Sequence, residues 1–313
     1  MLVFLIILLC LLALCLAVGG YTFYVACRRV KEIDWTDDEA VKGTAFGEFY
    51  THIAQGRQFL KDHGAQDVFM TNREGLRLHA VWVPAPNAKG TVIFAHGFHS
   101  CGLSDFSLAF ELYHDLNMNI LLLTHRTHDP SQGKFITFGV KESEDVRDWI
   151  DYHNQHLGNF PILCSGLSMG AATVMYLAGM DLPENVRGFV ADCGFTSPYE
   201  IISHVFSQKI HLPAWPVMWA ADLFARLFAG FSLKECHTTQ TLQKNTRPIL
   251  LVHGLEDDFV PAEMTRRSFE VCGGDKHLLL VEGAGHGVSF LVARQAYLDQ
   301  IYQLVEKVQN PKL

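Results

Sequence analysis

One serine of this sequence lies in a setting that would make it a nucleophile. Ser168 is the centre of GLSMG at 166–170, which follows an apolar run at 161–164 and precedes a helix-like stretch at 169–180. A G-x-S-x-G between a strand and a helix is typical of a nucleophile elbow, a sharp turn that exposes the serine hydroxyl. Glycines on both sides let the strand and the helix approach closely. The alternative is an ordinary strand-to-helix turn that needs small residues.

A serine hydroxyl needs a base to take its proton and a carboxylate to orient that base. His286 lies in the glycine-rich stretch GAGHG at 283–287, directly after an apolar run, and is the predicted base. Asp257 follows an earlier apolar run at 249–252 and is the predicted acid, with Glu256 and Asp258 as adjacent alternatives. The chain order serine, acid, histidine is that of α/β enzymes with a nucleophile elbow.

An acyl-transfer site also needs two backbone N–H groups that stabilise an oxyanion. The N–H of Met169, directly after the nucleophile, is one expected donor. The second is expected from the loop HGFH at 96–99, where Gly97 would let the N–H of Phe98 turn inward.

The elements that position these residues alternate between short apolar runs and helix-like stretches. Continuous apolar runs are typical of strands buried on both faces, and their alternation with helices predicts an α/β fold with a mostly parallel, doubly wound sheet. In such sheets the functional site lies at the carboxyl ends of the strands. The predicted core strands are 91–95, 119–123, 161–164, 188–191, 249–252 and 278–281, and the predicted helices are 103–116, 141–153, 169–180, 199–207, 262–272 and 290–308.

Two further segments have their own patterns. Residues 35–63 are predicted to be helical, and 67–71 and 76–83 to be strands that precede the parallel sheet. Residues 205–245 interrupt the alternation, and Trp215, Trp219, Leu223 and Leu227 recur every fourth residue there, as one stripe of a helix. This insertion is predicted either to face the core or to form a short helical cap, a lid over an apolar pocket.

The N-terminus is predicted to be a membrane anchor. Leu2 to Ala26 is a stretch of 25 mostly aliphatic residues without a charge, long enough to cross a hydrocarbon core of ~30 Å. Because no basic residue precedes it, an uncleaved transmembrane helix over 1–28 is favoured over a cleaved signal peptide that would lead to secretion. Arg28, Arg29 and Lys31 follow directly, which favours a cytoplasmic position for the domain at 29–313.

Composition narrows the function classes. The net charge of −8 disfavours a nucleic-acid partner, which requires a basic surface. The cysteines after the anchor are scattered without a C-x-x-C pair, so free thiols are expected and a structural zinc site is not. His96, His99, His125, His128 and Asp129 could suggest a metal hydrolase, but no metal-binding spacing such as H-E-x-x-H is present.

Taken together, HGF at 96–98, GLSMGAA at 166–172, HGLEDDFVP at 253–261 and GAGHG at 283–287 resemble the α/β-hydrolase superfamily over residues 65–310. Among its members the chain resembles bacterial membrane-anchored serine hydrolases with a short helical cap. In the family pattern HGxxDxxVP the position matched by Asp257 is the acid, so the resemblance favours Asp257 over Asp258. The chain departs from the family at 124–133, where relatives carry D-x-R-G-H-G-x-S, and the resemblance therefore implies no particular substrate.

The residues and the resemblance together lead to the expectation of a serine hydrolase that cleaves carboxylic esters, including lipid esters, without a cofactor or metal. A thioesterase, a peptidase and a cofactor-free haloperoxidase are alternatives on the same catalytic residues. Peptidases of this fold generally carry a propeller or a large cap, for which this length leaves no room. A binding protein without catalysis is a further alternative, disfavoured because Ser168, Asp257 and His286 are all present.

Overall fold

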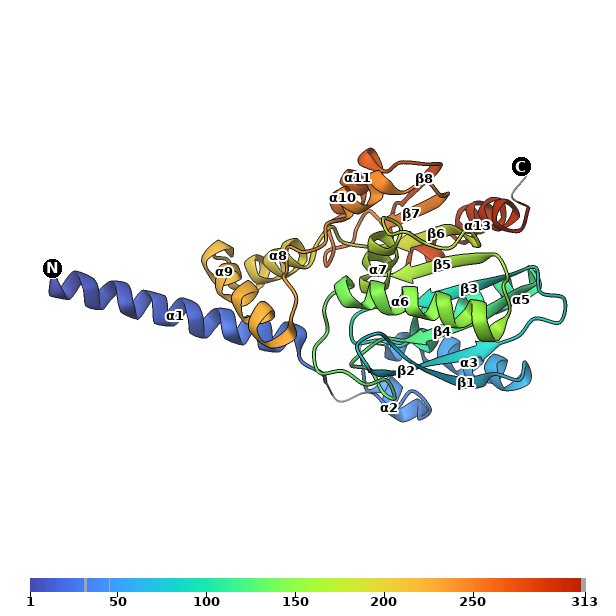
Figure 1. Cartoon of the computed structure of the whole chain (residues 1–313), viewed down its shortest axis with the longest axis horizontal. Coiled ribbons are helices and arrows are strands. Elements are labelled where there is room, and N and C mark those ends of the chain that lie inside the picture. The colour runs from blue at the N-terminus through green and yellow to red at the C-terminus, as the bar shows by residue number, and fades with distance from the viewer. Residues whose placement is uncertain (31–32, 45, 311–313) are drawn as a thin grey trace.

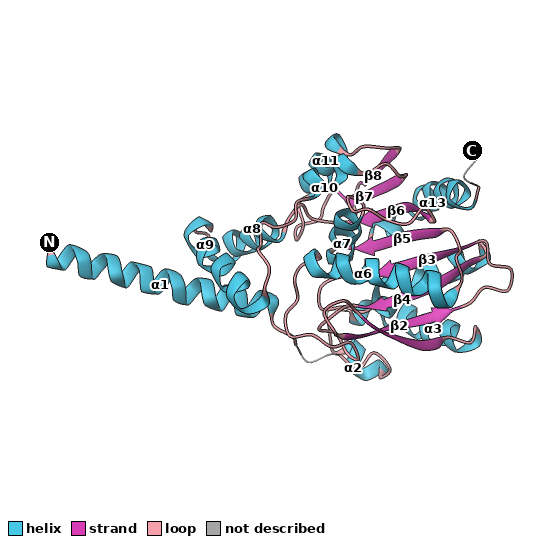
Figure 2. Cartoon of the chain, in the orientation of Figure 1, coloured by secondary structure: helices cyan, strands magenta, loops and turns pink. Residues whose placement is uncertain are grey.

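A computed structural model describes residues 1–30, 33–44 and 46–310. Lys31, whose charge contributed to the predicted membrane orientation, lies outside these residues. The described chain consists of a long N-terminal helix and a layered α/β domain with the sheet between helices (Figure 2).

The sheet has 8 strands in the order β1-β2-β4-β3-β5-β6-β7-β8. The strands from β4 to β8 in this order pair in parallel, whereas β1 and β2 form an antiparallel hairpin whose second strand is also antiparallel to β4. This confirms the predicted mostly parallel α/β fold. The strands are β1 Gln66–Thr71, β2 Arg77–Val83, β3 Gly90–Ala95, β4 Met118–Thr124, β5 Ile162–Leu167, β6 Val186–Asp192, β7 Ile249–Gly254 and β8 Lys276–Val281.

Both faces of the sheet are covered, which explains the continuous apolar runs. Along β3, Ile93 and Ala95 belong to the core cluster on the side of α6 and α7. The alternate residues Val92 and Phe94 belong to the opposite cluster, formed with α3, α5 and α13. The helices of the two layers are α3 Tyr50–Asp62, α4 Gly102–Phe106, α5 Phe110–Asp115, α6 Val140–Tyr152, α7 Met169–Leu177, α11 Ala262–Val271 and α13 Arg294–Gln309.

Three of the predicted helices are interrupted. The stretch 35–63 contains α2 (Asp38–Lys42), which ends at Gly43, and then α3. A 3₁₀ turn at Ser107–Ala109 separates α4 from α5, and α12 (Ser289–Val292) precedes α13. Apolar periodicity continues across such breaks, so it does not reveal them.

The N-terminal helix α1 (Leu2–Cys27) is long and apolar enough to cross a membrane, by length and composition. It projects from the domain beside an insertion between β6 and β7 (Figure 1). The insertion contains α8 Pro198–Ile210, α9 Trp215–Phe224, a π-helical turn at Ala225–Ala229 and α10 Thr238–Thr241.

The apolar stripe of α9 does not face the core, so the prediction of a core-facing helix was wrong. Trp215, Trp219, Leu223 and Leu227 are exposed. The buried face of α9 consists of smaller or more flexible residues, including Met218 and Ala221, which belong to a cluster with Phe23 of α1. Helical periodicity identified an apolar face, but the helix has two such faces and the close approach to α1 selects the one with small side chains.

Candidate active site

Ser168 occupies the turn between β5 and α7, where the sequence predicted an elbow. Its backbone has φ 54° and ψ −113°, a left-handed φ that is uncommon for a residue with a side chain. The Ser168 N–H donates to the Asp192 carbonyl at the end of β6, 2.8 Å away. The neighbouring strand therefore helps to hold the strained turn.

The two glycines of the elbow are required by close backbone contacts. A Cβ atom on Gly166 would collide with the backbone carbonyl of Gly170. A Cβ atom on Gly170 would collide with the carbonyl of Ala95 and lie 2.8 Å from that of His96. The end of β3 therefore lies directly against the start of α7.

The structure brings Ser168, His286 and Asp257 together from three loops at the carboxyl ends of β5, β8 and β7. His286 Nε2 lies 2.9 Å from Ser168 Oγ. His286 Nδ1 lies 2.7 Å from Asp257 Oδ2. This is the hydrogen-bonded geometry of a nucleophile, a base and an orienting acid.

Asp257 is the acid that reaches the histidine, while Glu256 and Asp258 are exposed. Its Oδ1 accepts the N–H groups of Phe259 and Val260 at 2.9 and 2.8 Å. Burial raises the pKa of Asp257, but hydrogen bonds from His253, His286 and the Val260 N–H outweigh it and hold this pKa well below its usual range. Asp257 is therefore ionised at neutral pH.

The geometry agrees with a comparison against known families. A family model described as "alpha/beta hydrolase fold" matches residues 90–228, a range that includes the elbow. The chain therefore resembles the α/β hydrolases in sequence over this range and has their fold.

The similar proteins are distant in sequence. The uncharacterized protein YqkD of Bacillus subtilis is 27% identical over 239 residues, covering 75% of this chain and 77% of its own. The human alpha/beta hydrolase domain-containing protein 17B is 24% identical over 252 residues, covering 79% and 77%. Among solved structures, an esterase of Pyrococcus furiosus superposes with a TM-score of 0.65 at 20% identity, covering 79% of this chain and 93% of its own. At this identity the last comparison concerns the fold.

One residue that contacts Asp257 was not predicted from the sequence. His253, at the end of β7, is buried, and its Nε2 lies 2.8 Å from the Val260 carbonyl and 3.2 Å from Asp257 Oδ2. Because a carbonyl oxygen can only accept a hydrogen bond, His253 Nε2 carries the proton. The same N–H group also lies within reach of the Asp257 carboxylate. His253 was noticed only as part of HGLEDDFVP, and no local signal distinguishes it from an ordinary core histidine.

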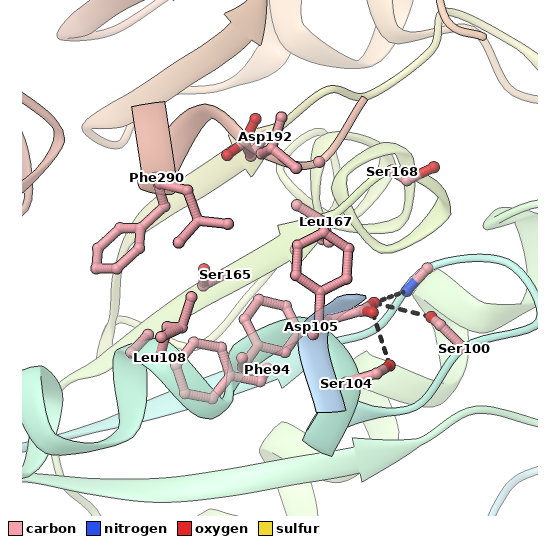
Figure 3. Close-up of a pocket in the computed structure, with 18 of the residues that line it drawn as sticks. Phe94, Ser100, Ser104, Asp105, Leu108, Ser165, Leu167, Ser168, Asp192 and Phe290 are labelled. Atoms are coloured by element: carbon pink, nitrogen blue, oxygen red, sulfur yellow. Dashed lines mark hydrogen bonds between the residues drawn. The ribbon is translucent and has the colours of Figure 1, made fainter. Parts of the chain in front are cut away.

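The predicted oxyanion loop is held by a second residue that the sequence analysis missed. Asp105 of α4 accepts the Gly97 N–H at 2.7 Å and the hydroxyls of Ser100 and Ser104 at 2.8 and 2.9 Å (Figure 3). Phe98 follows Gly97 in this loop and Met169 begins α7. Because Gly170 lies against the end of β3, the two expected donors belong to adjacent backbone segments; their role as an oxyanion hole stays a prediction.

Ser168 and His286 open into a cavity of about 270 Å³. Its wall is mostly apolar and includes Phe94, Leu108 and Phe290 (Figure 3). The segment before α3 also contributes to the wall. Asp105 and Asp192 are acids within it, and burial raises the pKa of Asp192 to about 6. The apolar lining includes Phe46, Phe49, Phe94, Phe98, Leu108, Leu167, Phe259, Val288, Phe290 and Leu291.

The expected lid does not cover this cavity. Of the residues that the structure describes, those at 205–245 contribute nothing to its wall, and the stripe of α9 points to the solvent. Phe46 and Phe49, from the chain before α3, line it instead. Their contribution depends on where α3 packs, which no motif in the sequence indicates.

The histidines at 96, 125 and 128 do cluster, as their positions on two neighbouring loops suggested. The His96 ring centre lies 4.5 Å from that of His125 and 4.6 Å from that of His128, and His96 Nε2 accepts the His125 N–H. In the described part of the chain, however, the group with ligand atoms close enough to share a metal ion is Cys193, Asp257 and His286. The histidine cluster joins two loops through the hydrogen bond from the His125 N–H to His96 Nε2.

Proposed function

We propose that this protein is a serine hydrolase that cleaves carboxylic esters through an acyl-serine intermediate. The α/β-hydrolase fold and the similarity to the family model over residues 90–228 support hydrolysis in general. The observation that carries the proposal is the chain of hydrogen bonds from Ser168 Oγ through His286 to Asp257, at the mouth of a largely apolar cavity.

In the first half-reaction, Ser168 Oγ attacks the ester carbonyl carbon while His286 Nε2 takes the hydroxyl proton. The carbonyl oxygen becomes an oxyanion, and the N–H groups of Phe98 and Met169 are proposed to stabilise it. Each such donor is typically worth about 3 kcal/mol in the transition state. As the tetrahedral intermediate collapses, His286 gives its proton to the leaving alcohol and the acyl group stays on Ser168.

In the second half-reaction, His286 takes a proton from water, which attacks the acyl-serine carbonyl. Collapse returns the proton to Ser168 and releases the carboxylic acid. Asp257 stays ionised throughout and keeps the proton of neutral His286 on Nδ1, so that Nε2 can accept. The low pKa of Asp257 supports this role.

The cavity supports an ester with an apolar acyl group. Its volume of about 270 Å³ is enclosed mostly by apolar side chains, as in sites that bind small apolar ligands. Among the residues that the structure describes, no lysine or arginine lines the cavity, so a neutral acyl group is the better occupant.

We also propose that α1 is an uncleaved transmembrane anchor. Arg28 and Arg29 at its end support a cytoplasmic domain by the positive-inside rule. Substrates would then reach the site from the membrane surface or the cytoplasm.

The test uses the full chain in detergent micelles or vesicles. A fluorophosphonate probe should label the wild type and lose its label in Ser168→Ala, and hydrolysis of p-nitrophenyl butyrate should fall by at least about 10³-fold in that variant. Ser207→Ala, on α8 away from the cavity, is the matched control and should keep both signals.

The proposal would be contradicted if the folded wild type showed no labelling by the probe and hydrolysed no ester from acetyl to palmitoyl. Matched thioester and anilide substrates separate an esterase from a thioesterase or a peptidase on the same residues.

A further inference from the structure

The exposed face of α9 is unusually apolar for a surface helix. Trp215 is 72% exposed, Trp219 57% and Leu227 67%. Leu212 and Phe228 extend the same patch at either end and are also exposed. A contiguous surface of large apolar side chains normally contacts a partner or a membrane.

This helix lies alongside α1 and runs in the same direction (Figure 1). Cys15 Sγ donates to the Pro216 carbonyl at 2.9 Å. Four residues further on, Gly19 lies so close to Ala220 that a Cβ atom on the glycine would collide with it. Gly20 faces the ring of Phe224, and the rings of Phe23 and Phe228 stack 6.4 Å apart. The contacts thus advance in the same direction along α1 and along α9 with the π-helical turn that follows it.

The length of α1 fixes the level of α9 relative to a bilayer. Residues 2–14 of α1 are exposed, and at ~1.5 Å per residue they reach about 20 Å. The hydrocarbon core is ~30 Å thick, so a span of ~20 residues that begins at Leu2 ends near Tyr21. Gly19, which contacts Ala220 of α9, lies two residues before that end, about 3 Å along the helix axis, so this contact falls at the boundary between the hydrocarbon core and the interfacial layer.

The charges of the insertion fit the same placement. Between Ile210 and Ala225 the charged side chain is Asp222, and it bonds to Arg226 at 3.0 Å and to the Leu233 N–H at 2.7 Å. Lys209 and Arg226 flank the apolar stretch. Tryptophans on an apolar face between basic residues are typical of helices at the membrane interface.

We propose that α9 inserts its exposed stripe into the interfacial layer of the bilayer that α1 crosses. The occupant of the apolar face is lipid, and α1 and α9 form a two-helix membrane contact that fixes the orientation of the domain. The proposal rests on the membrane placement of α1 and is independent of the hydrolytic activity.

The experiment measures tryptophan fluorescence of the full chain reconstituted into phosphatidylcholine vesicles, with and without bromine atoms on the acyl chains. Bromine quenches only indoles near the lipid chains. We expect clear quenching of the wild type and loss of most of it in the double variant Trp215→Phe/Trp219→Phe. Trp82 and Trp149 are buried in the core and Trp35 is on the chain before α2, so these three should contribute little.

The matched control is Trp35→Phe, which removes one indole outside the stripe and should keep the quenching. Equal quenching of the wild type and the double variant would overturn the proposal, as would its absence from the wild type. In the latter case, quenching by aqueous acrylamide would place the stripe in water. A blue-shifted emission that moves to the red on dilution with excess lipid would place it against a second copy. The far-UV circular dichroism spectrum of each variant, compared with that of the wild type, verifies that the variant is folded.

Discussion

Asp192 is a buried acid beside the proposed catalytic residues, and its environment differs from that of Asp257. Its backbone carbonyl supports the Ser168 turn, while its Oδ1 has no hydrogen-bond partner among the described residues. Burial favours the protonated form and raises its pKa from 3.8 to about 6. Asp257, with several donors, has its pKa shifted in the opposite direction. The pKa values of these two neighbouring carboxyl groups thus shift in opposite directions, because burial dominates at Asp192 whereas hydrogen-bond donors outweigh burial at Asp257.

The pKa of Asp192 predicts a pH-dependent cost to stability. Below about pH 4 the group is protonated in both the folded and the unfolded chain and costs nothing. As the pH rises through 6, the unfolded state has already lost the proton and the folded state must ionise a buried acid. The cost grows to about 3 kcal/mol, from about two pKa units at 1.36 kcal/mol each.

Asp192→Asn removes this cost. The difference in melting temperature between this variant and the wild type should therefore be several degrees more positive at pH 7.5 than at pH 4.5. Differential scanning fluorimetry at both values measures it. Asp258→Asn, at an exposed position, is the control and should show no such difference. A pH-independent effect of Asp192→Asn would contradict the raised pKa.

At the scale of elements, the site depends on how closely β3 and α7 approach. Gly170→Ala would place a methyl group against the carbonyls of Ala95 and His96, which are backbone atoms that cannot turn away. We expect fluorophosphonate labelling to fall at least about tenfold and stability to fall by about 1–3 kcal/mol, the usual cost of overpacking. Gly43→Ala, where the nearest atom would lie 3.5 Å away, should be tolerated. A fully active Gly170→Ala would show that the elbow is looser than described.

The segment before α3 is the element that we expect to limit acyl length. Phe49 lines the cavity and belongs to a short 3₁₀ turn, so Phe49→Ala should lengthen the pocket. In a series of p-nitrophenyl esters from acetyl to palmitoyl, the optimum should move to longer chains by two or more carbons. Leu223→Ala, on the exposed stripe of α9, should leave the optimum unchanged. If Leu223→Ala shifted the optimum and Phe49→Ala did not, the insertion at 205–245 would be supported as a lid over this pocket.

At the scale of the whole molecule, α1 is a packed part of the structure as well as a candidate anchor. Gly19, Phe23 and Cys27 are buried, and they lie against α9 and residues near 135. The last turns of α1 are therefore packed against the domain, because their side chains belong to one of its core clusters.

Gly19→Leu tests this packing. The new side chain would collide with Ala220 and separate α9 from α1, so limited proteolysis between 205 and 230 should become faster by several fold. Fluorophosphonate labelling should change little, since α9 does not line the cavity. Ala17→Leu, an exposed site two residues earlier, is the matched control. Unchanged proteolysis of Gly19→Leu would contradict a close α1–α9 contact.

The sequence by itself determined the features that depend on local pattern and chain order. Continuous apolar runs indicated the buried parallel strands, because both faces of such a strand are covered. GLSMG at 166–170 indicated the elbow, because only glycine tolerates the backbone contacts beside Ser168. Chain order and the glycines around His286 indicated the histidine and narrowed the acid to three adjacent residues.

The tertiary structure decided what depends on contacts between distant segments. It selected Asp257 by its bond to His286, added His253 and Asp105 as positioning residues, and lined the cavity with Phe46 and Phe49. It also turned the stripe of α9 outward, because the small residues of that helix meet Gly19, about two hundred positions away in the chain. Periodicity shows that a helix has an apolar face, but the partner that covers this face is set by packing.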